Sequence, residues 1–264
     1  MAVPRLAVFV HGLVADETVW NFSEDPATSY GSLLEQDLGY TPLYLRYNTG
    51  LHISENARQF ADLMEALLDR PGVQVDELLL IGHSMGGLVI RAAAWYGSQN
   101  NHRWTEKVKT IIYIASPHQG APLEKLGNLV TGILKGLPQP YLQVAGDIIN
   151  QRSDGIKDLR FGYLTQGEWS GGDPDAILTS HKELIPLLGG VRHHAISGTL
   201  TKNPAHPAAV ALGDFVVRNA SALGQSPLNE YSLPFTSVRV FPRMGHLRIA
   251  HDPLVYEQIK QWCR

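Results

Sequence analysis

The sequence predicts an α/β fold, with a mostly parallel sheet, helices on both faces of that sheet and an inserted segment over one of its edges. Short, wholly apolar runs such as LAVFV at residues 6–10 are typical of strands that are covered on both faces. These runs alternate with stretches of helical periodicity, as in successive βαβ units. The chain has 264 residues, 44% of them hydrophobic, which is enough for one sizeable core. We therefore expect a single domain over residues 1–264.

Six strands are expected along the chain, at residues 6–10, 43–47, 78–81, 108–115, 193–198 and 236–241. Helices are expected at 54–68, with Ser54 as the N-cap, at 86–97, and from Pro253 onward, with Asp252 as the cap. The alternation stops between residues 120 and 191, where short helices around 123–135 and 141–150 precede a Gly/Asp-rich stretch at 170–174. We interpret segment 120–191 as a lid or cap inserted over the carboxyl edge of the sheet.

Composition excludes several classes of protein. The formal net charge is −3 and no run of five like charges occurs, so we expect no nucleic-acid partner. No stretch reaches 18 apolar residues, which argues against integral membrane association. The single cysteine, Cys263, cannot form an intrachain disulfide. The first apolar run is interpreted as a strand and not as a signal peptide, so a cytoplasmic location is expected unless a signal was removed.

The stretch LLLIGHSMGGLVIRAA, residues 78–93, leads from an apolar strand straight into a helix. Gly82 and Gly86 stand two residues to either side of Ser84, and glycines relieve the crowding of such a sharp turn. The first turn of the helix adds backbone N–H groups and a positive dipole end, which favour a developing oxyanion. We therefore predict a nucleophile elbow at Ser84. The alternative, a glycine-rich turn with an incidental serine, is disfavoured by the flanking strand and helix.

A serine nucleophile needs a histidine to accept its proton and a carboxylate to orient that histidine. In folds with this elbow the acid and then the histidine follow the serine, each on a loop after a later strand. His246 lies between the last strand and the final helix and is predicted to be the base, while its rival His251 adjoins the helix cap. Core or surface roles are expected for His193 and His194, which begin a strand, and for His181 in the lid. His102 and His206 are expected in loops.

Asp214 is predicted to be the acid, because it is the first carboxylate after strand 193–198. The loop after strand 108–115 offers no carboxylate before Glu124. Solvated lid charges are expected at Glu168, Asp173 and Asp175, and Asp16 and Glu17 follow the first strand too closely to orient a base.

Backbone N–H groups at two positions are predicted to form an oxyanion hole. Leu13 follows His11 and Gly12 after the first strand, and Met85 follows Ser84. Their side chains could equally line an apolar pocket. We expect His118 to have a structural role, and residues 44–53 either to line an acyl pocket or to bond to the helix that follows. No metal or cofactor is predicted, and substrate-binding residues stay unassigned.

The combined motifs resemble those of the α/β-hydrolase fold, within the serine esterase and lipase family related to bacterial lipases and GPI-inositol deacylases. The matching pieces are FVHGL at 9–13, GHSMGG at 82–87, IASPHQG at 114–120, GDFVV at 213–217 and MGHL at 244–247. The resemblance implies Ser84, Asp214 and His246 as nucleophile, acid and base, and a carboxylic ester as substrate. Segment 120–191 departs from the known lids of the family.

We therefore expect a carboxylic ester hydrolase of the carboxylesterase or triacylglycerol lipase type, with a small-molecule ester or lipid as its partner and an acyl-enzyme on Ser84. Thioesterase, amidase and acyltransferase chemistry share that intermediate and stay open as alternatives. A non-catalytic binding module with the same fold is a third reading, which predicts a broken triad.

Overall fold

The computed structural model describes residues 5–122, 127, 153–170, 182–203 and 213–264. Its centre is a six-stranded sheet of order β2-β1-β3-β4-β5-β6, in which every neighbouring pair is parallel. The strands are β1 (Arg5–Val10), β2 (Thr41–Leu45), β3 (Glu77–His83), β4 (Val108–Ile114), β5 (Arg192–Thr199) and β6 (Ser237–Pro242). The predicted α/β class is confirmed, and each expected strand is present.

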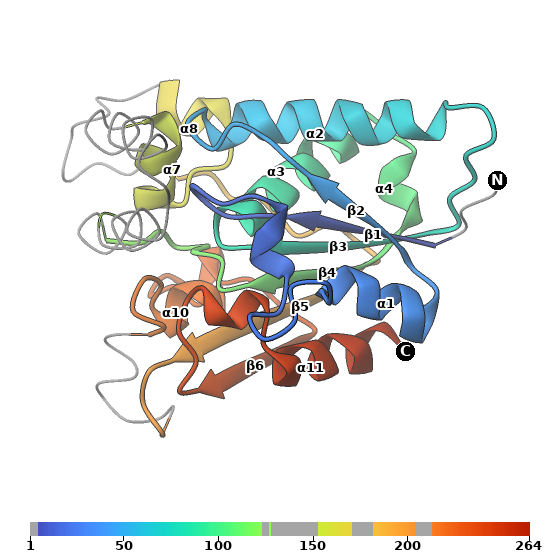
Figure 1. Ribbon diagram of the computed structural model, residues 1–264. Coiled ribbons are helices and arrows are strands. Elements are labelled where there is room, and N and C mark those ends of the chain that lie inside the picture. The colour runs from blue at the N-terminus through green and yellow to red at the C-terminus, as the bar shows by residue number, and fades with distance from the viewer. Residues whose placement is uncertain (1–4, 123–126, 128–152, 171–181, 204–212) are drawn as a thin grey trace, which may run out of the picture.

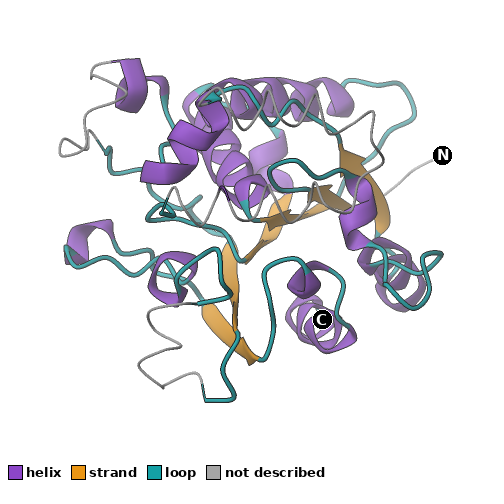
Figure 2. Cartoon of the chain, turned by 60° about the vertical axis from the view of Figure 1, so that its left-hand side comes forward, coloured by secondary structure: helices purple, strands orange, loops and turns teal. Residues whose placement is uncertain are grey.

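Helices cover both faces of the sheet, as predicted (Figures 1 and 2). One face carries α2 (Ile53–Leu68), α3 (Met85–Gln99) and α4 (Trp104–Lys107), and the other carries α1 (Tyr30–Leu38) and α11 (Pro253–Cys263). At the edge where the strands end lie α7 (Asp154–Phe161), α8 (Gln166–Ser170) and α10 (Asn219–Ala222). Short 3-10 helices span Glu17–Trp20, Asn229–Tyr231 and Arg248–Ala250.

Two hydrophobic cores lie on opposite faces of the sheet, because successive side chains of a strand point to opposite sides. Val8 and Leu80 belong to the core under α2 and α3. Phe9 and Ile81, one position further along the same strands, belong to the core under α1 and α11. This double coverage explains why the central strands read as continuous apolar runs without polar alternation.

Helix α2 begins differently from the prediction. Its N-cap residue is His52, and Ser54 lies buried in the first turn, where its Oγ accepts a hydrogen bond from Trp169 Nε1 at 3.0 Å. The carboxylate of Asp158, on α7, accepts the N–H of Ile53 at 2.7 Å and so takes the place of a local cap. The ring of His52 bonds to the same carboxylate and stacks on Trp169. Tertiary contacts therefore override the local capping preference of Ser54.

Segment 120–191 is described in part. The helices expected around 123–135 and 141–150 lie outside the described residues, apart from Gly127, as do residues 171–174 of the Gly/Asp-rich stretch. Glu168 was expected as a solvated charge, and this is wrong: it is buried and accepts backbone N–H groups from Leu164, Thr165 and Glu183. Those bonds hold its carboxylate inside the fold. The function of this segment as a lid stays a prediction.

The final helix matches the prediction, because Asp252 caps it by accepting the N–H of Leu254 at 3.0 Å. Cys263 lies in its last turn and is buried, and burial raises the pKa of the thiol to about 12. Among the described residues, no helix is both long enough and apolar enough to cross a membrane.

Buried histidines should make this fold sensitive to acid. Burial lowers the pKa of each histidine in the set His11, His83, His118, His193 and His194, to about 3 for His83 and about 4 for His194. The unfolded chain takes up a proton near pH 6.5 at each of these histidines, whereas the folded chain takes it up only at lower pH. The free energy of unfolding should therefore fall as the pH drops below that value, by up to about 1.4 kcal/mol per pH unit for each of His83 and His194 until the pH nears their folded pKa.

His194 offers a direct test, because its ring stacks on Trp262 with centroids 4.5 Å apart. We expect His194→Phe to keep the stacking and to flatten the loss of stability between pH 7 and pH 5, as measured by urea unfolding. Parallel stability curves for the wild type and the variant would contradict a neutral His194 in the folded chain.

Candidate active site

Ser84 occupies a strained turn between β3 and α3. Its backbone angles are φ 53° and ψ −121°, and its N–H donates to the carbonyl of Ile114 at 2.8 Å. The turn needs glycine on both sides. A β-carbon at Gly86 would collide with the carbonyl oxygens of Val10 and His11, and one at Gly82 would lie 2.6 Å from the Gly87 backbone. The serine is thus raised above the carboxyl edge of the sheet, as the motif predicts.

His246 and Asp214 lie beside Ser84 in the order expected for proton transfer. His246 Nε2 is 2.9 Å from Ser84 Oγ, and its Nδ1 is 2.7 Å from Asp214 Oδ2. Because a carboxylate only accepts hydrogen bonds, Nδ1 carries the proton and Nε2 is free to accept from the serine hydroxyl. All three residues are buried, at 3%, 4% and 1% exposure for Ser84, His246 and Asp214.

The carboxylate of Asp214 is fixed by its own loop. Its Oδ1 accepts the backbone N–H groups of Val216 and Val217 at 3.0 and 2.7 Å. Gly213, with φ 60°, precedes it, and Phe215 follows with φ 86°. This tight turn leaves Oδ2 directed at the imidazole, so the carboxylate fixes the orientation of the His246 ring.

Sequence reasoning did not assign a role to His83. Its Nε2 donates to the backbone carbonyl of His246 at 2.8 Å, and burial lowers its pKa to about 3, so the ring is neutral. The neighbour of Ser84 in the chain therefore holds the loop that carries the predicted base. Its place inside the GHSMGG motif was the one available signal.

The rival candidates lie elsewhere or outside the described residues. His251 Nδ1 bonds to the carbonyl of Val19 at 3.1 Å, Asp16 caps the helix Glu17–Trp20, and Glu17 pairs with Arg46. The candidates outside the described residues are Glu124, Asp173, Asp175, His181 and His206.

Side chains from residues 44–53 anchor the loop that follows β1. Tyr47 donates its hydroxyl to the carbonyl of His11 at 2.7 Å, and Thr49 Oγ1 accepts the N–H of Val14 at 3.3 Å. Within the described residues, no protein acceptor takes the N–H of Leu13 or of Met85. The N–H groups of both residues are therefore unpaired within the described residues.

Residues 44–53 also bond to the helix that follows, which is one of the two roles left open. Asn56 Nδ2 donates to the carbonyl of Asn48 at 2.9 Å, and His52 is the N-cap of α2. The stretch thus connects the loop after β1 to α2 and, through Asp158, to α7.

His118 is fully buried and packs edge-on against Tyr113, with ring centroids 4.9 Å apart, and against Phe235. Neither ring nitrogen has a hydrogen-bond partner among the described residues, and burial holds its pKa well below the usual value. Its carbonyl accepts from Lys182 Nζ at 2.7 Å. The neutral ring therefore packs as an aromatic group beneath the loop after β4.

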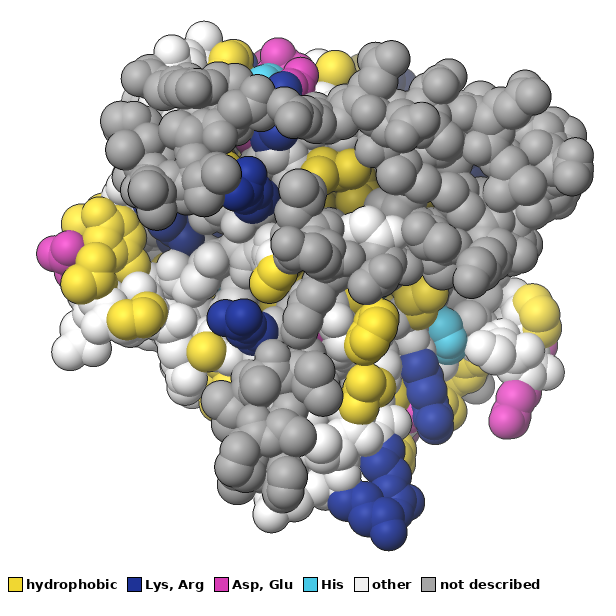
Figure 3. Space-filling model, turned by 90° about the vertical axis from the view of Figure 1, so that its left-hand side faces the viewer, with side chains coloured by type: hydrophobic (Ala, Val, Ile, Leu, Met, Phe, Trp, Pro, Cys, Tyr) yellow, Lys and Arg dark blue, Asp and Glu magenta, His cyan; other side chains and the backbone are white. Residues whose placement is uncertain are grey.

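The face over the carboxyl ends of the strands shows apolar and basic side chains of the described residues between the segments drawn in grey (Figure 3). Three apolar side chains next to the strand-end loops are exposed, at 45%, 50% and 38% for Leu200, Phe215 and Leu247. Among the described residues, no group of three or more His, Cys, Asp or Glu side chains could hold a metal ion.

Comparisons with known proteins support the same architecture. Residues 19–140 match the family described as the PGAP1-like alpha/beta domain. A GPI inositol-deacylase of Emericella nidulans is 32% identical over 111 residues, which are 42% of this chain and 9% of that protein. The chain thus matches less than a tenth of the length of this curated relative.

Solved structures resemble the whole chain at low sequence identity. The mature lipase BlEst2 of Bacillus licheniformis matches with a TM-score of 0.61 and 15% identity, covering 99% of this chain and 92% of the lipase. A Pyrococcus furiosus esterase matches with a TM-score of 0.54 and 12% identity, covering 98% and 82% of the two chains. Together with the six-stranded parallel sheet, these matches confirm the α/β-hydrolase fold and the predicted resemblance to bacterial lipases and GPI inositol-deacylases.

Close approach of α3 to the end of β1 can be tested at Gly86. We expect Gly86→Ala to lower the free energy of unfolding by about 1–3 kcal/mol, since the added methyl group meets two backbone carbonyls. Gly189→Ala is the matched control, because nothing lies within 4 Å of a β-carbon there. Equal stability of the two variants in urea unfolding would show that a methyl group fits between α3 and the end of β1.

Proposed function

We propose that this chain, an α/β-hydrolase by fold, is a serine hydrolase that cleaves carboxylic esters through an acyl-enzyme on Ser84. One observation carries the proposal: the buried series Ser84, His246 and Asp214 is joined by hydrogen bonds of 2.9 and 2.7 Å. Such a series activates a hydroxyl that is otherwise a weak nucleophile.

In the proposed reaction His246 Nε2 takes the hydroxyl proton while Ser84 Oγ bonds to the ester carbonyl carbon. The carbonyl electron pair moves onto its oxygen, and collapse of this intermediate breaks the bond to the alcohol oxygen, which takes the proton from His246. Water then gives a proton to the same nitrogen and attacks the acyl-enzyme. Collapse of the second tetrahedral intermediate releases the carboxylic acid, and His246 returns the proton to the oxygen of Ser84.

The negative charge on the carbonyl oxygen is proposed to lie between the N–H groups of Leu13 and Met85. Both amides are without a protein acceptor in the described residues, and Met85 begins α3, whose dipole favours an anion at that end. Loss of one such donor typically costs about 10²–10³ in rate, so the geometry of the loop after β1 is proposed to contribute to catalysis beside the triad.

Names of the related proteins agree with ester chemistry. A lipase, an esterase and an inositol-deacylase all act on acyl groups, and an acyl lipid or a smaller carboxylic ester is the proposed substrate class. Thioesters and amides pass through the same acyl-enzyme, and acyltransferases replace water by another acceptor. Segment 120–191 is proposed to cap the site, since α7 and α8 pack against the start of α2.

Replacement of the nucleophile gives the first test. We expect Ser84→Ala to lower kcat for p-nitrophenyl esters by on the order of 10⁴-fold or more, because no acyl-enzyme can form. Release of p-nitrophenol from short-chain and long-chain esters measures it, with matched thioester and amide substrates alongside. Turnover of thioester alone by the wild type would replace the esterase proposal with a thioesterase, and undiminished ester turnover by Ser84→Ala would refute both.

The choice of base is tested by a pair of alanine variants. We expect His246→Ala to abolish most ester turnover, since the serine then loses its proton acceptor. His251→Ala should stay within a few-fold of the wild type, because that ring bonds to the Val19 carbonyl and not to Ser84. The opposite ranking in the same p-nitrophenol assay would make His251 the base.

A further inference from the structure

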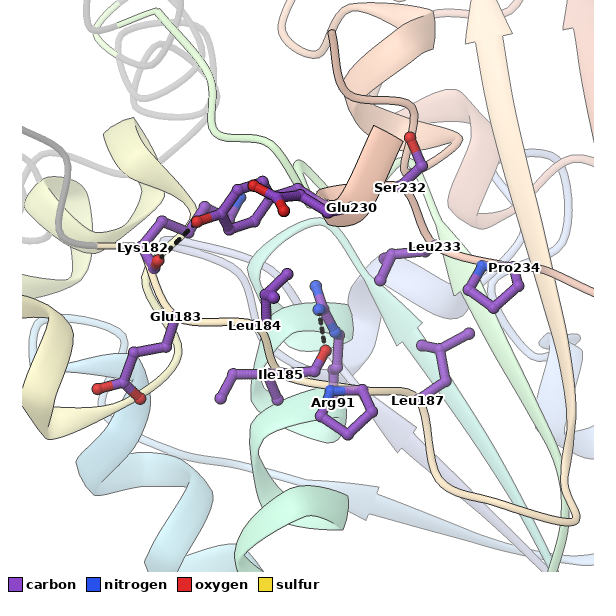
Figure 4. Close-up of a pocket in the computed structure, with 12 residues that line it drawn as sticks. Arg91, Lys182, Glu183, Leu184, Ile185, Leu187, Glu230, Ser232, Leu233 and Pro234 are labelled. Atoms are coloured by element: carbon purple, nitrogen blue, oxygen red, sulfur yellow. Dashed lines mark hydrogen bonds between the residues drawn. The ribbon is translucent and has the colours of Figure 1, made fainter. Parts of the chain in front are cut away.

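A cavity lies on the flank of α3, apart from the proposed triad. Its volume is about 460 Å³, within the range of about 300–1,000 Å³ that ligand pockets occupy. Two straps line it, residues 182–187 before β5 and residues 230–234 before β6. Ser84, Asp214 and His246 are not among its lining residues. Figure 4 shows the two straps facing each other across Arg91.

Arg91 stands two helical turns beyond Ser84 and is only 5% exposed. Its Nη2 donates to the carbonyl of Ile185, and its Nε has no acceptor among the described residues. The guanidinium is directed into the space between Ile185 and Leu233 (Figure 4). A buried guanidinium normally faces a carboxylate, and none of the ion pairs in the described part of the chain includes this one.

Lys182 brings a second cation to the same cavity. Its Nζ donates to the carbonyl of His118 and to Gln119 Oε1 at 2.7 and 2.9 Å, both neutral acceptors. Burial and the positive charge of Arg91 lower its pKa to about 8. The two cations therefore repel each other across a cavity that is partly shielded from water.

The nearby carboxylates accept hydrogen bonds from groups other than these two cations. Glu168 accepts three backbone N–H groups, and Glu183 accepts the hydroxyl of Thr165 at 2.9 Å. In Figure 4 the Glu183 side chain points away from Arg91, and Glu230 is exposed at the rim. Glu168 lies close enough for its charge to act on both cations, but among the described residues no carboxylate forms an ion pair with Arg91 or Lys182.

We propose that this cavity binds a monocarboxylate with an apolar tail, with the carboxylate at Arg91 and Lys182 and the tail against Leu184, Leu187 and Leu233. A guanidinium presents N–H groups in a planar fork that matches a carboxylate, and the free Nε–H supplies one of them. Leucine, isoleucine and proline make up most of the remaining lining residues, which favours an acyl chain over an inorganic anion. The site is independent of the proposed ester hydrolysis.

Isothermal titration calorimetry with octanoate below its micelle concentration tests the proposal. We expect the wild-type chain to bind octanoate, and to bind octan-1-ol and inorganic phosphate at least tenfold more weakly. Arg91→Gln should weaken octanoate binding at least tenfold. Arg70→Gln, which removes an exposed arginine at the end of α2, should leave it unchanged.

Two further variants keep the test decisive if Arg91→Gln fails to fold. Lys182→Gln should also weaken octanoate binding, and Leu187→Trp should block it by filling the cavity from a half-exposed position on the strap. Octanoate binding with the wild-type affinity in both variants would place the ligand elsewhere, the proposed active site included, and would overturn the proposal. Equal affinity for octanoate and phosphate would overturn the proposal that the cavity recognises an apolar tail, because the site would then bind anions in general.

Discussion

The contact between the first turn of α3 and the end of β1 governs the rest of the site. Gly86 lies against the carbonyl oxygens of Val10 and His11 so closely that no side chain fits between them. This approach forces the positive φ of Ser84 and raises its hydroxyl above the sheet. The same contact lies between the loop that carries Leu13 and the helix that begins at Met85. A single backbone contact thus ties the turn at Ser84 to the loop after β1.

Strained backbone is concentrated around this edge of the sheet. Six non-glycine residues in the described part of the chain have positive φ, and five of them lie in strand-end loops: Val14, Ser84, Ala115, Phe215 and Arg243. Each such conformation costs on the order of 1–3 kcal/mol and persists only where the surroundings enforce it. The doubly covered sheet provides those surroundings, since every loop leaves a strand that is paired on at least one side.

Sequence patterns predicted the features that depend on residues close together in the chain. The buried strands were visible as apolar runs, and the elbow was visible because glycines flank Ser84 at a fixed spacing. Chain order was enough to select Asp214 and His246, which lie within hydrogen-bond distance of each other. Features made by contacts between distant segments were not predictable in this way. The bond from His83 to the His246 carbonyl and the cationic cavity at Arg91 join residues that are many positions apart, so neither periodicity nor spacing marks them. The carboxylate of Glu168 is likewise bound partly by the N–H of Glu183, 15 positions further along the chain.

The burial of Cys263 makes this chain a convenient object for spectroscopy. Thiol reagents attack the thiolate, and a thiol with a pKa of about 12 is almost wholly protonated at neutral pH. A cysteine introduced on the surface would therefore take up a maleimide dye or spin label ahead of the native one. Because the sequence contains no other cysteine, the native residue need not be removed first, and the last turn of α11 keeps its packing.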